Sequence, residues 1–260
     1  MSEPFPIEVT IVGCGTSTGV PVLGCTCAVC TSDDPRNKRT RVSCLVEVSG
    51  KRILIDTPPD LRGQALREGF KTVDAILFTH AHADHVHGID DTRLFNYNNG
   101  YREIPAFASP ETAENLLARF GYAFGLSSYP GSPKLHMTGV QEGFTVGGVK
   151  IEPVPVPHGP AGTVYGFRIG DFAYITDCND VPVEAIEKLR GLEALVLDCL
   201  RQEPHPTHLH LERSVELARL IGARRTVFTH ISHDLGYADG PKLLPEGMEF
   251  AYDGLRIEIE

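Results

Sequence analysis

Residues 78–88 read Phe-Thr-His-Ala-His-Ala-Asp-His-Val-His-Gly and hold four of the chain's 11 histidines. These histidines and one aspartate fall between His80 and His87, directly after the short apolar run Ala75–Thr79. Such a run is typical of a buried strand, and the carboxyl end of a strand is where α/β folds place their sites. Imidazole binds zinc, iron and nickel and, together with carboxylates, manganese. The stretch therefore indicates a metal site rather than a solvated polar loop.

Other metal-type side chains recur farther along the chain, again at the ends of strand-like runs. Any one of them alone would be interpreted as a polar residue that caps a strand. Together with the first cluster they form one set of candidate ligands. They are His158 after Ile151–Val156, Asp177 after Phe172–Thr176, and His230 after Arg225–Thr229.

The pattern of strands and helices predicts an α/β (α+β) fold. Strand-like runs lead and helical patterns interleave in two similar halves, which favours two packed sheets with helices outside. A chain of 260 residues suits one large domain spanning residues 1–260. The expected strands include Ile7–Val12, Ser43–Val48, Arg52–Asp56, Pro105–Ala108, Thr145–Pro155, Val164–Ile169 and Ala194–Asp198, and the expected helices are Asp60–Glu68, Val181–Leu189 and Leu211–Ile221.

Charge and hydropathy exclude some classes of function. The net charge is −10 with histidine neutral, whereas a general nucleic-acid binder needs a basic surface. The chain has no run of 18 apolar residues, which a membrane span would require. The N-terminal residues show no signal-peptide pattern and lead straight into a strand-like run. We therefore expect a cytoplasmic protein with no membrane partner and no stable nucleic-acid partner.

The order His-x-His-x-Asp-His after a strand, with a separate His, Asp and His at later strand ends, resembles the metallo-β-lactamase fold hydrolases. The resemblance covers essentially the whole chain. It implies a four-layer αββα sandwich with two divalent metal ions between the sheet edges. The ligands that it implies are His80, His82 and His158 for one ion, Asp84, His85 and His230 for the other, and Asp177 as the bridge.

A pair of metal ions also suits hydrolysis on chemical grounds. Two divalent ions about 3.5–4 Å apart can ionise a shared water near neutral pH and polarise a phosphoryl or carbonyl oxygen. Asp56 ends its strand-like run, and we expect it to accept a hydrogen bond from the imidazole of a ligand. His87 is left without an assigned role.

Three cysteines are packed into six residues, as Cys25, Cys27 and Cys30. In a cytoplasmic chain, clustered cysteines indicate a metal site rather than disulfides. Structural zinc takes four protein ligands. The fourth ligand could be Cys44 or a histidine, and His233 stands out because it lies only three residues after His230.

The cysteine loop after the first strand, with Thr-His-Ile-Ser-His near the end, is similar to the PhnP-type phosphodiesterases. The resemblance implies that Cys25, Cys27, Cys30 and His233 bind one structural Zn²⁺. It also implies an active-site metal that is often manganese. The substrates that it implies are five-membered cyclic ribose phosphates, notably 5-phosphoribosyl 1,2-cyclic phosphate.

The same subgroup carries a catalytic histidine upstream of the last strand. The segment here is Glu-Pro-His-Pro-Thr-His-Leu-His-Leu-Glu, and its spacing from His230 favours His208, with His205 and His210 as competitors. A protonated imidazole can neutralise a phosphate oxygen or protonate a leaving alkoxide. We expect Asp84 and His208 to be the catalytic residues.

We therefore predict a phosphoric diester hydrolase that uses two Mn²⁺ or Zn²⁺ ions on a small cyclic phosphate. A homodimer is the commonest expectation for such an enzyme. The alternatives are a tRNA 3′-processing-type nuclease, a thioesterase, and a non-catalytic metal-binding protein of cofactor biosynthesis. The nuclease would need a basic arm that clamps RNA, and none is apparent. The stretch that holds Lys38, Arg39 and Arg41 could meet a substrate phosphate, although a solvated charge run is the simpler interpretation.

Overall fold

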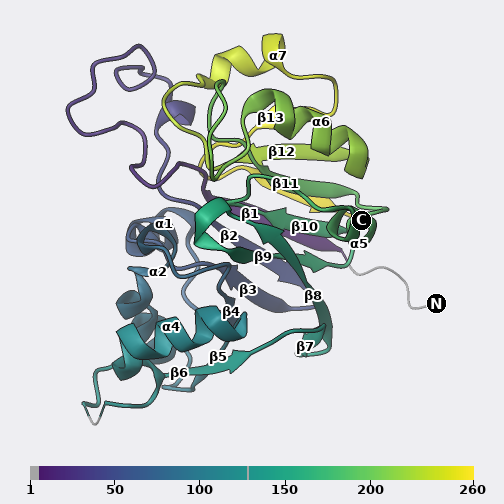
Figure 1. Ribbon diagram of the computed structural model, residues 1–260. Coiled ribbons are helices and arrows are strands. Elements are labelled where there is room, and N and C mark those ends of the chain that lie inside the picture. The colour runs from purple at the N-terminus through teal and green to yellow at the C-terminus, as the bar shows by residue number, and fades with distance from the viewer. Residues whose placement is uncertain (1–5, 128) are drawn as a thin grey trace.

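The computed structural model describes residues 6–127 and 129–260 and has two sheets packed face to face between outer helices (Figure 1). This is the αββα arrangement that the sequence predicted. Residues 1–5, which belong to the segment inspected for a signal peptide, lie outside the described residues. No helix in the described part of the chain is both long and apolar enough to cross a membrane.

The two sheets have matching internal patterns. Within the described residues, each sheet has seven strands, in the orders β14-β1-β2-β3-β4-β5-β6 and β13-β12-β11-β10-β9-β8-β7. Each sheet has three antiparallel strand pairings on one side and three parallel pairings on the other. The strands are β1 (Ile7–Gly13), β2 (Ser43–Val48), β3 (Lys51–Ile55), β4 (Ala75–Leu77), β5 (Ile104–Ala108), β6 (Leu135–Gly139), β7 (Phe144–Val146), β8 (Val149–Pro157), β9 (Thr163–Ile169), β10 (Phe172–Ile175), β11 (Ala194–Asp198), β12 (Arg225–Thr229), β13 (Met248–Phe250) and β14 (Arg256–Ile259).

Helices cover the outer face of each sheet. One apolar core lies between the sheets and draws residues from both, and two further cores lie beneath the outer helices. The helices are α1 (Leu61–Glu68), α2 (Ala83–Val86), α3 (Arg93–Asn98), α4 (Pro110–Phe120), α5 (Val183–Lys188), α6 (Leu211–Ile221) and α7 (Gly240–Leu243).

Turn chemistry explains where the strand predictions succeed and fail. The β2–β3 hairpin turns through Ser49 and Gly50, both with positive φ, as a tight two-residue turn requires. The run Thr145–Pro155, predicted as one strand, is instead the β7–β8 hairpin, because Gly147 and Gly148 adopt positive φ and reverse the chain. Asp60 does precede α1 as predicted, but its carboxylate bonds Arg41 rather than capping the helix.

Strand direction decides where the polar ends meet. Strands β8, β10 and β12 run in the same direction, because β8 and β10 are both antiparallel to β9 and β12 continues the parallel part of the sheet. Their carboxyl ends therefore share one edge. Asp177 and His230, which follow β10 and β12, have φ of 55° and 60°. Non-glycine residues seldom adopt such angles, and those that do concentrate at functional sites.

Candidate metal centre

The first half of the site comes from the loop after β4. His80 and His82 lie in the extended segment before α2, and their ring centroids are 4.5 Å apart. Asp84 and His85 lie within α2, which turns them toward His80; the rings of His80 and His85 are 4.1 Å apart. His87 follows α2 and contacts the guanidinium of Arg119, 2.9 Å away, on the exposed side.

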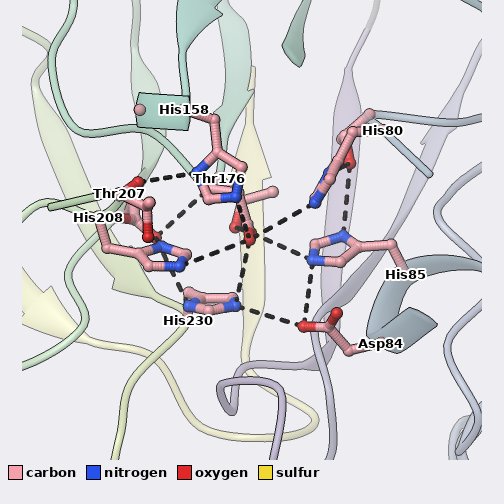
Figure 2. A network of polar contacts seen from close by, with 12 residues as sticks. His80, Asp84, His85, His158, Thr176, Thr207, His208 and His230 are labelled. Atoms are coloured by element: carbon pink, nitrogen blue, oxygen red, sulfur yellow. Dashed lines mark hydrogen bonds and ion pairs between the residues drawn. The ribbon is translucent and has the colours of Figure 1, made fainter. Parts of the chain in front are cut away.

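The second half comes from the opposite sheet and centres on Asp177. Figure 2 shows His158, His208 and His230 of this half facing His80, His85 and Asp84 of the first. Its Oδ2 is 3.7 Å from Nε2 of His80, 3.9 Å from Nε2 of His158 and 3.5 Å from Nε2 of His230. Its Oδ1 is 3.2 Å from Nε2 of His85. The Asp177 carboxylate thus lies between imidazoles from both sheets.

These side chains form two donor groups that share Asp177. In each group the donor atoms lie within 4.8 Å of one another. Nε2 of His80, His85 and His230 is buried and has no hydrogen-bond partner among the described residues, so these atoms fit metal ions, which need free imidazole lone pairs. The groups are His80, His82, His158 and Asp177, and Asp84, His85, Asp177 and His230.

Neighbouring groups fix the ring orientation of two of these histidines. Nδ1 of His85 donates to Oδ2 of Asp56 over 2.7 Å, as the sequence led us to expect, and Thr79 holds the same carboxylate through its amide and hydroxyl. Nδ1 of His158 donates to the carbonyl of Thr207 over 2.8 Å. Each bond occupies Nδ1 and leaves Nε2 directed at the centre.

The charges at the centre are those of a cation site. Burial raises the pKa of Asp177, but the nearby His230 and His85 outweigh burial and lower that pKa well below its usual range. Burial lowers the pKa of His85, but the carboxylates of Asp177, Asp84 and Asp56 outweigh it and raise that pKa. Burial and the charge of His85 lower the pKa of His80 well below its usual range, so its lone pair is free. In the metal-free protein, the ionised carboxylates therefore stabilise a proton on His85, at the place where a cation would bind.

Of the three candidate catalytic histidines, His208 is the one at the centre. Its ring stacks on that of His230 at 4.6 Å, and its Nε2 is 4.0 Å from Asp177 Oδ2. His205 lies one ring farther out, 5.2 Å from His208. His210 precedes α6 at the N-cap, and its backbone forms a bridge to Arg201.

Asp198 lies at the centre, although sequence reasoning assigned it no role. It ends the buried strand β11, and its Oδ1 is 3.5 Å from Nδ1 of His208 and 3.7 Å from Nδ1 of His230. Its Oδ2 accepts from the amide of Leu209 over 2.8 Å, which holds the loop behind His208. Burial lowers the pKa of His208, but Asp198 outweighs it and raises the pKa to about 9. A lone acid at the end of an apolar strand was the available signal.

Comparison with known proteins identifies the family. A family model described as a beta-lactamase superfamily domain matches residues 51–231, which contain every donor of the two groups around Asp177. The chain belongs to the metallo-β-lactamase superfamily. Within that superfamily, the crystal structure of a diphosphatase from the PhnP family superposes with a TM-score of 0.91 at 46% identity, and covers 98% of this chain and 97% of that one. The chain is thus a PhnP-type member of a family of metal-dependent hydrolases.

Other relatives carry different names. An octanoyltransferase from Porphyromonas gingivalis is 38% identical over 255 residues, which are 96% of this chain but only 51% of that protein, so the chain spans about half of its length. Ribonuclease Z from Mycolicibacterium gilvum is 26% identical, over 86% of this chain and 84% of the relative. Zn²⁺-bound PqqB from Methylobacterium extorquens is 23% identical with a TM-score of 0.76, covers 97% of this chain and 100% of that one, and shares the fold.

The PhnP-type cysteine loop converges on a histidine, as the resemblance implied. Nδ1 of His233 lies 3.2 Å from Sγ of Cys25 and 3.5 Å from Sγ of both Cys27 and Cys30. Three sulfurs around one imidazole nitrogen fit a tetrahedral zinc ion. Cys44, the alternative fourth ligand, is buried in the core between the sheets, so the structure favours His233. The zinc itself stays a prediction.

The basic stretch before β2 is only partly a solvated charge run, because Lys38 is exposed but Arg39 is buried. Arg39 is 1% exposed and donates to the carbonyls of Ser232 and Leu235, which flank His233. Arg41 pairs with Asp60. Sequence reasoning missed the structural role of Arg39. Its partners among the described residues are two backbone carbonyls and the side-chain amide of Asn37, and no acidic residue in the sequence points to them. Arg39 fixes the segment that carries both His230 and His233.

Proposed function

We propose that this protein is a metal-dependent phosphodiesterase that hydrolyses small cyclic phosphates, such as 5-phosphoribosyl 1,2-cyclic phosphate. The observation that carries the proposal is the position of His208, whose Nε2 lies 4.0 Å from Oδ2 of Asp177 and whose Nδ1 lies 3.5 Å from Oδ1 of Asp198. Figure 2 shows its ring beside that of His230. Cleavage of an ester with a poor leaving group requires a proton donor beside the electrophilic centre. The similarity to a PhnP-family diphosphatase supports chemistry at phosphorus.

We propose a metal-binding role for each of the donor groups described above. Bound there, two Mn²⁺ or Zn²⁺ ions would supply Lewis-acid activation of a water and of a phosphoryl oxygen. Asp84, whose carboxyl pKa is held below its usual range by His85 and His230 despite burial, stays ionised and so offers a negative oxygen to a metal ion or to a hydrogen-bond donor. His80, His82, His158 and Asp177 would hold one ion, Asp84, His85, His230 and Asp177 would hold the other, and Cys25, Cys27, Cys30 and His233 would hold the structural zinc.

His208 and Asp198 handle the leaving group. Asp198 faces Nδ1 of His208 and stabilises the imidazolium, so Nε2–H points to the centre. When the phosphate ring opens, that proton passes to the departing alkoxide oxygen, and His208 becomes neutral. Since alkoxides leave poorly without a proton, this step gives His208 its largest effect on cyclic substrates.

A diphosphate is the second candidate substrate, favoured by the name of the 46% identical relative. Its leaving group is a phosphate, which departs without much help from an acid. The two substrates therefore make different demands on His208. The expectations of a cytoplasmic location, a possible homodimer and no nucleic-acid or membrane partner stay predictions.

The test is a substrate panel on metal-stripped protein reloaded with Mn²⁺ or Zn²⁺. It compares ribose cyclic phosphates, a dinucleotide diphosphate, bis(p-nitrophenyl) phosphate, a thioester and a precursor tRNA. We expect metal-dependent cleavage of the cyclic phosphate, with about three ions per chain. His208→Ala should lower kcat on it about 10²–10⁴-fold and have a much smaller effect on bis(p-nitrophenyl) phosphate, whose leaving group is activated. Preferred cleavage of the thioester or tRNA, or metal binding without turnover, would defeat the proposal.

A further inference from the structure

His205 is the histidine of the Glu-Pro-His-Pro-Thr-His segment that the proposed mechanism leaves unused. It is half-buried and lies beyond His208, so the rings of His230, His208 and His205 follow one another from the centre outward, with centroids 4.6 Å and 5.2 Å apart. A leaving group that takes its proton from His208 and moves outward from the centre would pass His205.

Side-chain hydrogen bonds from two other segments hold the loop around His205. The carbonyl of Pro204 accepts from the guanidinium of Arg201 over 2.8 Å, and the carbonyl of Pro206 accepts from Asn179 over 3.2 Å. Asn179 also accepts from the amide of Gly159, which ties this loop to the one that follows His158. Flanking prolines fix the backbone further. His205 is therefore pre-positioned.

Hydrogen bonding fixes the tautomer of His205. Its Nδ1 accepts from the amide of Thr207 over 3.4 Å and lies 3.1 Å from the Thr207 hydroxyl. A backbone N–H can only donate, so Nδ1 carries a lone pair and the ring proton must sit on Nε2. No carboxylate bonds the ring among the described residues, and no partner of Nε2 is present there either. His205 thus offers one free N–H donor, and the positive guanidinium of Arg201 binds the carbonyl of Pro204, the residue directly before it.

We propose that His205, in the field of Arg201, forms a subsite for a second phosphoryl group on the leaving-group side of the substrate. A fixed N–H donor beside a cation suits an anionic oxygen. The inference rests on the proposed function and narrows it to substrates whose leaving group carries a further phosphoryl group, as a 5-phosphorylated ribose cyclic phosphate or a diphosphate does.

The test compares inorganic phosphate with pyrophosphate by calorimetric titration of the metal-loaded protein, with metal per chain counted afterwards. Phosphate reaches only the centre, whereas pyrophosphate extends to His205. We expect His205→Ala to weaken pyrophosphate binding about tenfold or more and phosphate binding less than about threefold. His136→Gln, an exposed histidine on β6, is the matched control and should change neither affinity.

Two replacements separate a contact from a structural role. The amide nitrogen of Gln can reach the position of Nε2, whereas that of Asn reaches only the position of Nδ1. His205→Gln should keep pyrophosphate affinity near that of the wild type, and His205→Asn should lose it. ¹⁵N NMR of the histidine rings should show the Nε2–H tautomer.

Several results would overturn the subsite: unchanged binding in His205→Ala, equal losses for phosphate and pyrophosphate, Gln no better than Asn, or an Nδ1–H tautomer. The readout does not need turnover. Pyrophosphate binding that depends on His205 in a protein that cleaves no phosphoric ester or anhydride would defeat the proposed function alone. Cleavage of such substrates with binding independent of His205 would defeat the subsite alone.

Discussion

Replacing Asp56 by Asn tests the metal centre without replacing any proposed metal ligand. The Asp56 carboxylate is fully buried and accepts three hydrogen bonds of 2.7–2.8 Å, one from His85 and two from Thr79. Asn can still accept from the Thr79 amide with its one carbonyl oxygen. Its NH₂ then faces Nδ1 of His85, which can accept that bond only by moving its proton to Nε2. A protonated Nε2 cannot bind a metal.

We therefore expect Asp56→Asn to weaken metal binding at the paired site about 10–100-fold, the range for loss of a carboxylate that orients a metal-ligating histidine. That factor equals about 1.4–2.8 kcal/mol. The unfolding free energy of the metal-free protein should fall by about 1–3 kcal/mol, because one buried donor loses its acceptor. Competition with a chromogenic chelator measures the first quantity, and urea denaturation of the stripped protein measures the second.

Asp74→Asn is the matched control, since it removes the same charge from the same sheet. The Asp74 carboxylate accepts from Lys51 over 3.1 Å and its side chain is 38% exposed, so its loss should cost about 1 kcal/mol or less and leave metal affinity unchanged. The reasoning is refuted if Asp56→Asn binds metal as tightly as the wild type, or if Asp74→Asn weakens binding equally.

Three further variants probe other parts of the structure. Cys27→Ser should remove one zinc ion per chain and lower the melting temperature more than it lowers kcat, because structural zinc contributes folding free energy; an unchanged zinc count would contradict the site. Asp198→Asn should flatten the pH dependence of unfolding in the metal-free protein. The Asp198–His208 attraction, which raises the pKa of His208 from 6.5 to about 9, stabilises the fold fully below about pH 6.5 and is lost as the pH rises through about 9. Urea denaturation from pH 6 to 10 measures this slope, and a wild-type slope in the variant would speak against the pairing. Arg39→Met should lower the unfolding free energy by about 2–4 kcal/mol, because two buried carbonyls lose their donor; a change below about 0.5 kcal/mol in urea denaturation would show that Arg39 is dispensable.

Much of the site was readable because its donors follow strands. Apolar runs mark where strands end. The sequence alone therefore places the segment from His80 to His87, and later Asp177 and His230, at sheet edges. The two sheets followed from the same runs. Whether a side chain can bind a metal depends on its residue type, which can be read directly from the sequence.

The features that escaped prediction depend on contacts between distant segments. Asp198 meets His208 and His230 only once three loops converge, and nothing beside it in the chain marks that meeting. Arg39 is buried by a segment some 190 positions away. Helix α4 was readable and overlooked: Ser109 caps it by accepting from the Thr112 amide, and Pro110 follows directly.

Because the donors are divided between the two sheets, a bound metal pair would hold the two halves of the fold together. Four donors come from the loop after β4, and the others come from the opposite sheet, so the complete set exists only when the two halves are docked. Any ion that binds only the docked form stabilises it by about 2.7 kcal/mol at 100 times its dissociation constant. A chain cut in the turn between β6 and β7 should therefore reassemble from its two pieces more tightly as metal is added, and the recovered activity would report on how well the halves find each other.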